Sequence, residues 1–346
     1  MARRGRMARS GRTVAVALGV FLLGQVALNA ALETVRPEWR DPEFGWRLKA
    51  VRKLAGRPLV LALGSSRTQM GLSPHDLGLG DGVIVYNFGE AGSGPLHLLL
   101  NLRRVLDAGV KPDAVLVEVM PAVLSHPGAA EDFFHDHVTR LGYADLGRLE
   151  PYCDDATTLR NRWLAHRVSP WHAQRFLLLS HWQPGLLPWQ ARVDFQWRMM
   201  DDRGWVPYPF ETIPEDHRQR QTADVARQYE QTLREFTLAP LPDRALRDLL
   251  ALCQERGIAV AMYRMPEGSM FRQWTSPSAT ATIEGYLAQL STTTGVPIFD
   301  ATTWLPDEAF ADGHHPLKSG AKRFSARFGR ECLNPWLTSC KLTPDP

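Results

Sequence analysis

The sequence predicts an α/β protein with a parallel sheet, preceded by one N-terminal membrane helix. Short apolar runs of strand length alternate with helical patterns from residue 58 to 121, and the alternation resumes after residue 240. A run of uncharged residues, 14–32, comes before all of them. The chain has 346 residues, of which 44% are hydrophobic and 22% charged, as is typical of a globular protein.

The N-terminal run is long enough to span a membrane once. Arginines precede it at positions 3, 4, 6, 9 and 12, and the bulk of the chain follows it. A retained anchor is favoured over a cleaved signal peptide, because residues 26–31 offer only a poor cleavage site. By the positive-inside rule, the sequence predicts a single-pass protein of the cell membrane with a periplasmic body.

Five strands are expected, at residues 59–63, 83–86, 114–119, 258–263 and 296–299. The main helical patterns lie at 95–108, 241–256, 278–292 and 317–333. Strands that alternate with helices favour a three-layer, flavodoxin-like parallel sheet. In such a sheet the residues that follow the strands gather at one edge, where ligands usually bind.

These expectations divide the chain into six segments. A cytoplasmic tail (1–12), a transmembrane signal-anchor (13–32) and a tether (33–57) lead into the α/β core, which comprises 58–121 and 241–334. Residues 335–346 form a C-terminal tail. Residues 122–240 break the alternation and carry an amphipathic helical pattern at 215–236, so we expect an inserted cap or substrate-binding region rather than a featureless loop.

The first chemical signal is a glycine turn at the end of the first strand. The apolar run ends at Gly64, and Ser65, Ser66 and Arg67 follow at once. A serine at the start of the next helix gains from the helix dipole and from nearby backbone N–H groups, which favours Ser66 as a nucleophile. Taken alone, however, Gly-Ser-Ser is more often a turn with a serine N-cap.

The second signal is Asp312-Gly-His-His315-Pro near the C-terminus. A carboxylate three residues from a histidine can hold one imidazole nitrogen while the other faces a serine. Asp132 and His135 share this spacing, but the glycine and proline of the later copy favour a tight turn there. Asp312 and His315 are therefore the predicted orienter and base, whereas His314 is expected to serve the substrate or to cap the loop.

Together these motifs resemble the SGNH (GDSL-type) hydrolase superfamily. Gly64-Ser65-Ser66 is similar to its first block and Asp312-Gly-His-His315-Pro to its last, which implies a catalytic set of Ser66, Asp312 and His315. Residues 86–92 resemble the second block, which implies that the N–H of Gly92 joins that of Ser66 in an oxyanion hole. The resemblance covers residues 58–120 and 255–330.

One block departs from the family pattern. The third block, Gly-x-Asn-Asp, should follow the third strand, but residues 114–121 contain no Asn. That departure, with Gly-Ser-Ser-Arg and a strand ending in Pro121, resembles the membrane-anchored branch related to alginate and cell-wall O-acetylation proteins. The resemblance implies acyl-ester chemistry on envelope polysaccharide, with a membrane-bound acyl-transfer partner as one possibility.

Further polar residues lie where they can reach the carboxyl edge of the predicted sheet, next to Ser66. Glu267 and Arg272 follow the fourth strand, and either can hold Arg67, contact a polar substrate or form an ordinary loop salt bridge. Cys332 and Cys340 are close enough in sequence to staple the C-terminus, whereas Cys153 and Cys253 are far apart. The eleven tryptophans are attributed to core packing in preference to a ligand cleft.

The sequence disfavours several other kinds of binding site and catalytic motif. His135 and His137 lack further ligands at metal spacing, so no metal is expected. The order of glycines in 89–94 is reversed from the dinucleotide fingerprint, and no serine lies in G-x-S-x-G, so neither a nicotinamide cofactor nor an α/β-hydrolase elbow is expected. A net charge of +3, partly from the N-terminal arginines, implies no nucleic-acid surface. Residues 201–207 read as a turn.

The sequence thus predicts an extracytoplasmic serine esterase or O-acyltransferase that needs no cofactor, with an acyl-ester or carbohydrate substrate. An alternative from another class is a catalytically weak module that keeps the fold and scaffolds an envelope complex. The missing Asn favours this alternative, and the intact Ser, Asp and His oppose it.

Overall fold

The computed structural model describes residues 2–54, 56–80, 82–125, 138–153, 155–188 and 191–342. His135 and His137, and with them the disfavoured metal pair, lie outside these residues. The chain divides into two compact units. Unit 1 comprises Met1–Gly45 and Asp136–Phe195, and unit 2 comprises Trp46–His135 and Gln196–Pro346. Residues 196–240, assigned to the cap from sequence, thus group with the sheet, whereas 136–195 group with the N-terminal segment.

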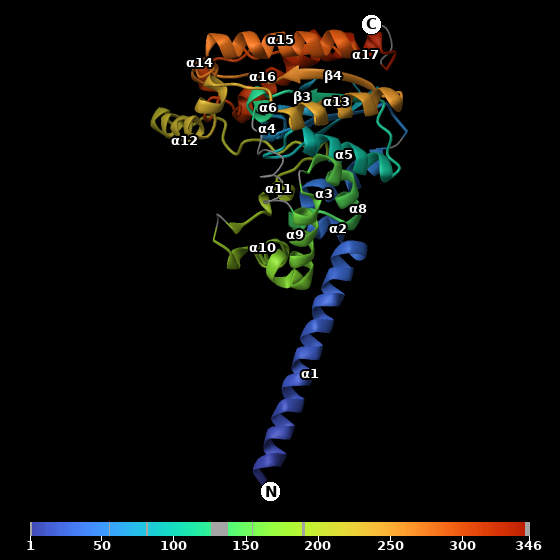
Figure 1. Ribbon diagram of the computed structural model, residues 1–346. Coiled ribbons are helices and arrows are strands. Elements are labelled where there is room, and N and C mark those ends of the chain that lie inside the picture. Colours follow the sequence, from blue (N-terminus) through green and yellow to red (C-terminus); the bar gives the residue numbers. More distant parts are fainter. Residues whose placement is uncertain are drawn as a thin grey trace. The chain divides into compact units, whose positions relative to one another are not determined.

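Unit 2 is built on a five-stranded parallel sheet (Figure 1). The strand order is β2-β1-β3-β4-β5, and every neighbouring pair is parallel. The strands are β1 (Leu59–Gly64), β2 (Ile84–Gly89), β3 (Ala114–Glu118), β4 (Ala259–Arg264) and β5 (Ile298–Asp300). All five predicted strands are therefore present, and the α/β class is confirmed.

Both faces of the sheet are covered. Alternate strand residues point to opposite faces. One set, including Val60, Leu116 and Ala261, packs against Phe324 and Phe328 of helix α16 (Lys318–Phe328). The intervening residues, such as Leu61, Val115 and Met262, are also buried. Strands apolar on both faces are typical of parallel sheets enclosed by helices.

The helices of unit 2 follow the predicted alternation. The helices wholly within this unit are α4 (Ser66–Gly71), α5 (Pro95–Asp107), α6 (Pro121–Ser125), α12 (Glu215–Arg234), α13 (Pro240–Glu255), α14 (Ser269–Gln273), α15 (Pro277–Thr294), α16 (Lys318–Phe328) and α17 (Asn334–Ser339) in the part of the chain that the structure describes. Short 3-10 turns lie at Arg52–Leu54, Pro74–Asp76 and Asp307–Ala309, and a π-helical turn at Gly329–Leu333 joins α16 to α17. Helix α17 lies within the predicted tail, and its Leu337 is buried in the core.

The two edges of the sheet differ. At the β2 edge, Asn87 N donates to Arg203 O at 2.8 Å, so residues 201–206 run alongside the strand. Asp201 Oδ1 accepts from the backbone N–H groups of Arg203 and Trp205, each at 2.9 Å, which forms the predicted turn. At the other edge, β5 has only three residues and is partly exposed.

Unit 1 is helical in the residues that the structure describes. It contains α1 (Ala2–Ala30), a π-helical turn (Ala31–Val35), α2 (Pro37–Arg40), α8 (Tyr143–Leu149), α9 (Ala156–Val168) and α10 (Pro170–Trp182). Short 3-10 turns lie at Val138–Arg140, Glu150–Tyr152 and Pro184–Leu186. Helices α3 (Pro42–Val51) and α11 (Phe195–Arg198) cross from one unit to the other. Residues 37–51, part of the predicted tether, are thus largely helical.

One helix of the described residues is long and apolar enough to cross a membrane. It extends over Gly11–Val35; its most apolar 18-residue stretch has a mean hydropathy of 2.0, and only 6% of that stretch is buried. An apolar helix that is exposed along most of its length fits a lipid environment. No disulfide joins Cys332 to Cys340, so the staple that their closeness in sequence allows is not formed.

Candidate functional site

Ser66 begins α4 directly after the turn that ends β1. Ser65 is the N-cap of this helix, and its hydroxyl accepts from Arg67 N at 3.2 Å. The turn needs glycine, because a Cβ on Gly64 would overlap the Thr68 hydroxyl and lie 2.5 Å from Glu118 Oε2. Ser65 and Arg67 are buried, whereas Ser66 between them is partly exposed. The predicted serine is therefore the one of the pair that solvent reaches.

A chain of hydrogen bonds joins Ser66 to the C-terminal motif. Ser66 Oγ lies 2.7 Å from His315 Nε2, and His315 Nδ1 lies 2.6 Å from Asp312 Oδ2. The other carboxylate oxygen of Asp312 accepts from the backbone N–H groups of His314 and His315, at 3.1 and 2.8 Å. Residues 249 positions apart in sequence thus meet in the order serine, imidazole, carboxylate.

Electrostatics fix the protonation of Asp312. Burial raises the pKa of Asp312, but the charge and hydrogen bonds of His315 outweigh burial and hold that pKa well below its usual value. Asp312 is therefore a carboxylate at neutral pH, and it accepts a hydrogen from Nδ1 of His315. In neutral His315, Nε2 then has a free lone pair and accepts the hydroxyl hydrogen of Ser66.

The loop after β4 supports the turn that carries Asp312 and His315. Gly268 N donates to Gly313 O at 2.7 Å. Gly313 adopts φ of +88°, a left-handed conformation that favours glycine, and it lets the chain fold the imidazole back onto the carboxylate. Ala311 N donates to His315 O at 2.9 Å and closes the turn.

A buried carboxylate, Glu118, lies beneath the serine turn at the end of β3. Its Oε2 accepts from Ser65 N and from Thr68 Oγ1, each at 2.7 Å. Burial raises the pKa of Tyr263 well above its usual value, so its hydroxyl stays protonated and donates to Thr68 at 2.5 Å. Sequence reasoning noted the missing Asn here but overlooked Glu118. A glutamate inside an apolar strand run was the available signal, because buried carboxylates need partners.

Arg67 connects the two halves of the site. Its guanidinium is 1% exposed and lies between two carboxylates, with Nη1 3.1 Å from Glu267 Oε1 and Nε 3.6 Å from Glu118 Oε1. Nη2 donates to Met265 O at 2.9 Å. Glu267 therefore holds Arg67, one of the roles expected for it. Arg272 instead donates to the backbone carbonyls of Glu267 and Thr302.

His314 is buried among aromatic rings. Its ring stacks on Phe271 with 5.1 Å between centroids and meets the edge of Tyr229 at 5.5 Å. Burial, and secondly the neighbouring His315, lower the pKa of His314 well below its usual value, so the ring is neutral at pH 7. A side chain 2% exposed does not present itself to a substrate from solvent. Of the two roles expected for His314, support of the loop is the one that fits this position.

Two backbone amides at the sheet edge have free hydrogens. Neither Ser66 N nor Gly92 N has a hydrogen-bond acceptor among the described residues. Gly92 follows β2, has φ of +75° and is exposed. Because Gly64 and Gly89 pair in register at the ends of β1 and β2, both amides follow the carboxyl edge of adjacent strands. Their role as an oxyanion hole stays a prediction.

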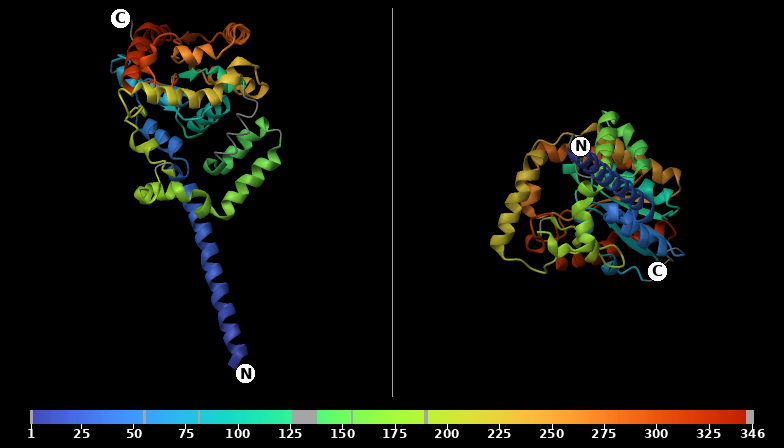
Figure 2. Two further views of the ribbon diagram at one scale, coloured as in Figure 1. Left: turned by 90° about the vertical axis from the view of Figure 1, so that its left-hand side faces the viewer. Right: turned by 90° about the horizontal axis from the view of Figure 1, so that it is seen from below.

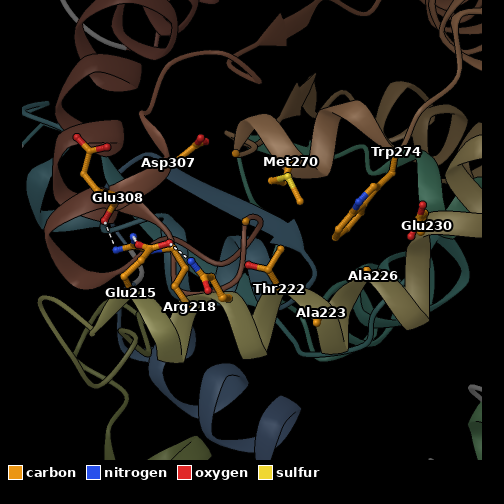
Figure 3. Close-up of a pocket in the computed structure, with 13 residues that line it drawn as sticks. Glu215, Arg218, Thr222, Ala223, Ala226, Glu230, Met270, Trp274, Asp307 and Glu308 are labelled. Atoms are coloured by element: carbon orange, nitrogen blue, oxygen red, sulfur yellow. Dashed lines mark hydrogen bonds and ion pairs between the residues drawn. The ribbon is translucent and has the colours of Figure 1, made fainter.

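A cavity of about 810 Å³ lies next to the loop that carries the histidine. Gly268 and Gly313 form part of its wall, and the rest comes mainly from α12, α14 and the 3-10 turn at Asp307–Ala309. Figure 3 shows Met270 and Trp274 facing Thr222 and Ala226 across the space. Asp307 and Glu308 line one end. Its size and mixed lining are those of a small-molecule site.

Among the described residues, two groups of side chains have the spacing to be considered for a metal ion. One is Asp312, His314 and His315, and the other is His75, Asp201 and Asp202. In the first, the imidazole and carboxylate of His315 and Asp312 already bond each other, and Nε2 bonds Ser66. The second is largely exposed, and His75 bonds Asp202 at 2.7 Å. Neither geometry calls for an ion.

No protein-family model and no curated protein matches the sequence. Among solved structures, the chain is similar to the crystal structure of a "putative acylhydrolase" from Bacteroides fragilis NCTC 9343. The identity is 11% and the TM-score 0.39, over 86% of this chain and 98% of that chain. Function is therefore inferred from the geometry of the site itself.

Proposed function

We propose that the protein is a serine-dependent acyl-ester enzyme of the SGNH type, anchored by α1 and working outside the cytoplasm. The observation that carries the proposal is the hydrogen-bond chain from Ser66 through His315 to Asp312. Nucleophile, base and orienting carboxylate stand in the order that acyl transfer requires. The strand order β2-β1-β3-β4-β5, known from flavodoxin-like sheets, also supports the assignment.

In the proposed reaction, Ser66 Oγ attacks the ester carbonyl while its proton passes to His315 Nε2. Asp312 stabilises the imidazolium that results and keeps the ring oriented. The N–H groups of Ser66 and Gly92 donate to the developing oxyanion. The imidazolium then protonates the leaving alcohol, and an acyl-serine remains. His315 next removes a proton from the acceptor that attacks this acyl-serine; the bond from the acyl carbon to Ser66 Oγ then breaks, and the imidazolium returns the proton to Ser66 Oγ.

The identity of the acceptor decides between two activities. Water gives an esterase, whereas a sugar hydroxyl gives an O-acyltransferase that requires an acyl donor, such as a membrane-bound partner. The residues around Ser66 serve both reactions equally. The resemblance to the membrane-anchored O-acetylation branch supports acetyl esters of envelope polysaccharide as substrates.

Covalent labelling tests the proposal directly. Purified full-length protein in detergent should react with a fluorophosphonate probe, and mass spectrometry should place the adduct on Ser66. Ser66→Ala should abolish labelling, whereas Arg227→Gln, a change at an exposed residue of α12 outside the cavity, should leave it intact. Absence of an adduct on Ser66 from pH 6 to 9, in protein that melts cooperatively, would refute serine catalysis.

A binding or assembly module is the second candidate. It is favoured by one observation: Glu118, Val119, Met120 and Pro121 follow one another at the end of β3, and none supplies the side-chain amide that the family uses. A folded protein that resists the probe and yet retains a polysaccharide ligand would support this candidate.

The membrane orientation has its own test. Alkaline phosphatase fused after residue 346 should be active in a bacterial host, because the arginines before the apolar run keep the N-terminus in the cytoplasm. An inactive fusion, with an active cytoplasmic reporter at the same position, would reverse the orientation. A mature chain that starts near residue 31 would show cleavage instead of anchoring.

A further inference from the structure

Exposed apolar side chains concentrate in unit 1. Outside residues 2–35, ten large hydrophobic side chains of the described residues are exposed, and seven of them lie between residues 138 and 188. Six belong to α9, α10 and the turn that follows: Leu164, Val168, Trp171, Phe176, Trp182 and Leu186. Trp182 and Leu186 are 70% and 74% exposed. Trp171 and Trp182 are eleven residues apart and so lie on the same side of α10, roughly 20° from each other at 100° per residue. Exposed apolar side chains that gather on a protein surface are typical of a binding face.

The charge of this segment has one sign. Residues 156–193 contain no Asp or Glu but five arginines, at positions 160, 162, 167, 175 and 192. Arg175 lies over the ring of Phe176, 4.4 Å from its centroid, so a cation accompanies an exposed apolar group. Aromatic side chains mixed with arginines are typical of segments at the boundary between lipid headgroups and acyl chains.

The same helices pack on the apolar N-terminal helix near its carboxyl end. Trp171 N donates to Gln25 Oε1 at 3.3 Å, and Asn29 Nδ2 donates to Arg167 O. Figures 1 and 2 show α9 and α10 beside that end of α1, while the remainder of α1 extends away from them. Glu33, just beyond the apolar run, pairs with Arg167 at 2.6 Å.

These contacts fix the depth of α10 relative to the apolar run. The run ends at Leu32, so Gln25 and Asn29 lie about 10 Å and about 5 Å inside it at 1.5 Å per residue. Amphipathic helices at membrane surfaces insert to roughly 5–10 Å. If α1 spans the bilayer, the start of α10 lies within the interfacial layer of that membrane.

We propose that α9 and α10 form a second membrane-contacting surface, the α9–α10 patch, defined by the six apolar side chains named above. They insert among the lipids of the leaflet from which α1 emerges, and Arg162 and Arg175 bind anionic headgroups; Arg160, Arg167 and Arg192 pair with carboxylates of the chain. This proposal rests on α1 as a membrane span but does not depend on the serine chemistry. Its consequence is that unit 1 is fixed to the membrane surface at two places.

Photo-crosslinking in proteoliposomes tests the patch. Four variants of the full-length chain each carry benzoylphenylalanine at one position. It replaces Trp182 or Leu186 in the patch, Leu22 in α1, or Phe210, which is an exposed aromatic of unit 2. Positions 182, 186 and 22 should yield lipid adducts, and position 210 should not. Adducts at 22 without any at 182 or 186 would overturn the patch and leave the anchor intact. No adduct at 22 would overturn both.

The headgroup half of the proposal has a separate readout. In vesicles with about 30% phosphatidylglycerol, the adduct yield at position 182 should exceed the yield in pure phosphatidylcholine several-fold, and 0.5 M salt should reduce the difference. Arg162→Gln with Arg175→Gln should remove it, whereas Arg227→Gln on exposed α12 should not. Equal yields in both lipids, or a protein adduct at 182, would contradict it.

Discussion

Arg67 Nη1 and Glu267 Oε1 lie 3.1 Å apart in a fully buried position, and this pair ties the serine turn to the histidine turn. Arg67 follows Ser66 in sequence, and Glu267 precedes Gly268, whose N–H donates to Gly313 between Asp312 and His315. The distance from Ser66 Oγ to His315 Nε2 therefore depends on a charge pair as well as on the sheet.

Replacement of Arg67 should separate these two turns. Arg67→Lys keeps the charge but cannot reach Glu267, Met265 O and Glu118 together, because an ammonium lacks the planar fork. We expect fluorophosphonate labelling of Ser66 to slow at least about tenfold. Arg227→Lys, an exposed pair on α12, is the matched control and should change nothing. Equal labelling rates in both variants would show that Arg67 does not position Ser66.

The two serines should separate catalysis from stability. Ser66→Ala and His315→Ala should each reduce ester turnover at least about a thousandfold, with unfolding free energies close to wild type. Ser65→Ala removes an N-cap and a hydrogen bond to Glu118, so it should cost about 1–2 kcal/mol of stability and at most about tenfold in turnover. Turnover and urea unfolding of the three variants measure both effects. If Ser65→Ala, and not Ser66→Ala, caused the thousandfold loss of turnover, the nucleophile would be Ser65.

His314 should make stability fall at mildly acidic pH. Its pKa is lowered in the folded state, so below about pH 6.5 the unfolded chain binds a proton that the folded chain does not. Its contribution is therefore fully present above that pH and is lost as pH falls, by up to about 1.4 kcal/mol per pH unit. His314→Phe keeps the stack on Phe271 and should flatten urea stability between pH 6.5 and 5. If the unfolding free energies of wild type and His314→Phe changed with pH in the same way, His314 would not cause the fall in stability.

Gly64→Ala should damage the serine turn without touching a catalytic group. The added methyl meets Thr68 and Glu118, which already bond each other, so neither can give way freely. We expect a loss of about 1–3 kcal/mol in unfolding free energy. Gly82→Ala is the control, because a Cβ there has nothing within 4 Å. A thermal shift no larger at position 64 than at 82 would argue that the turn is loose.

Local patterns in the sequence were enough to predict the strands and the main helices. The β strands read as apolar runs closed by glycine or proline, and helices such as α5 and α13 have clear apolar stripes. The turn at Ser66 and the turn at Asp312 were also visible, because small residues and prolines mark them. That they lie within hydrogen-bonding distance of each other follows from the parallel order of the sheet.

The remainder depends on partners far apart in the chain. Nothing local indicates that Glu118 bonds Ser65 and Thr68, or that Trp171 bonds Gln25, since each pair is made only by the packed structure. For the same reason the sequence could not divide residues 122–240 between the two units. Cys332 and Cys340 are close in sequence, yet closeness alone does not give two thiols the geometry that a disulfide needs.

The borders of the sheet bear on how the protein behaves when it is concentrated in a membrane. A long, flat strand with unpaired backbone groups invites a second molecule to add its own strand. Here one border is occupied by residues 201–206 of the same chain, and the other, β5, is three residues long and ends in Asp300, which pairs with Arg264. If α1 anchors neighbouring copies in one bilayer, each copy therefore meets one occupied border and one short, charged border, and both disfavour the addition of a second molecule's strand.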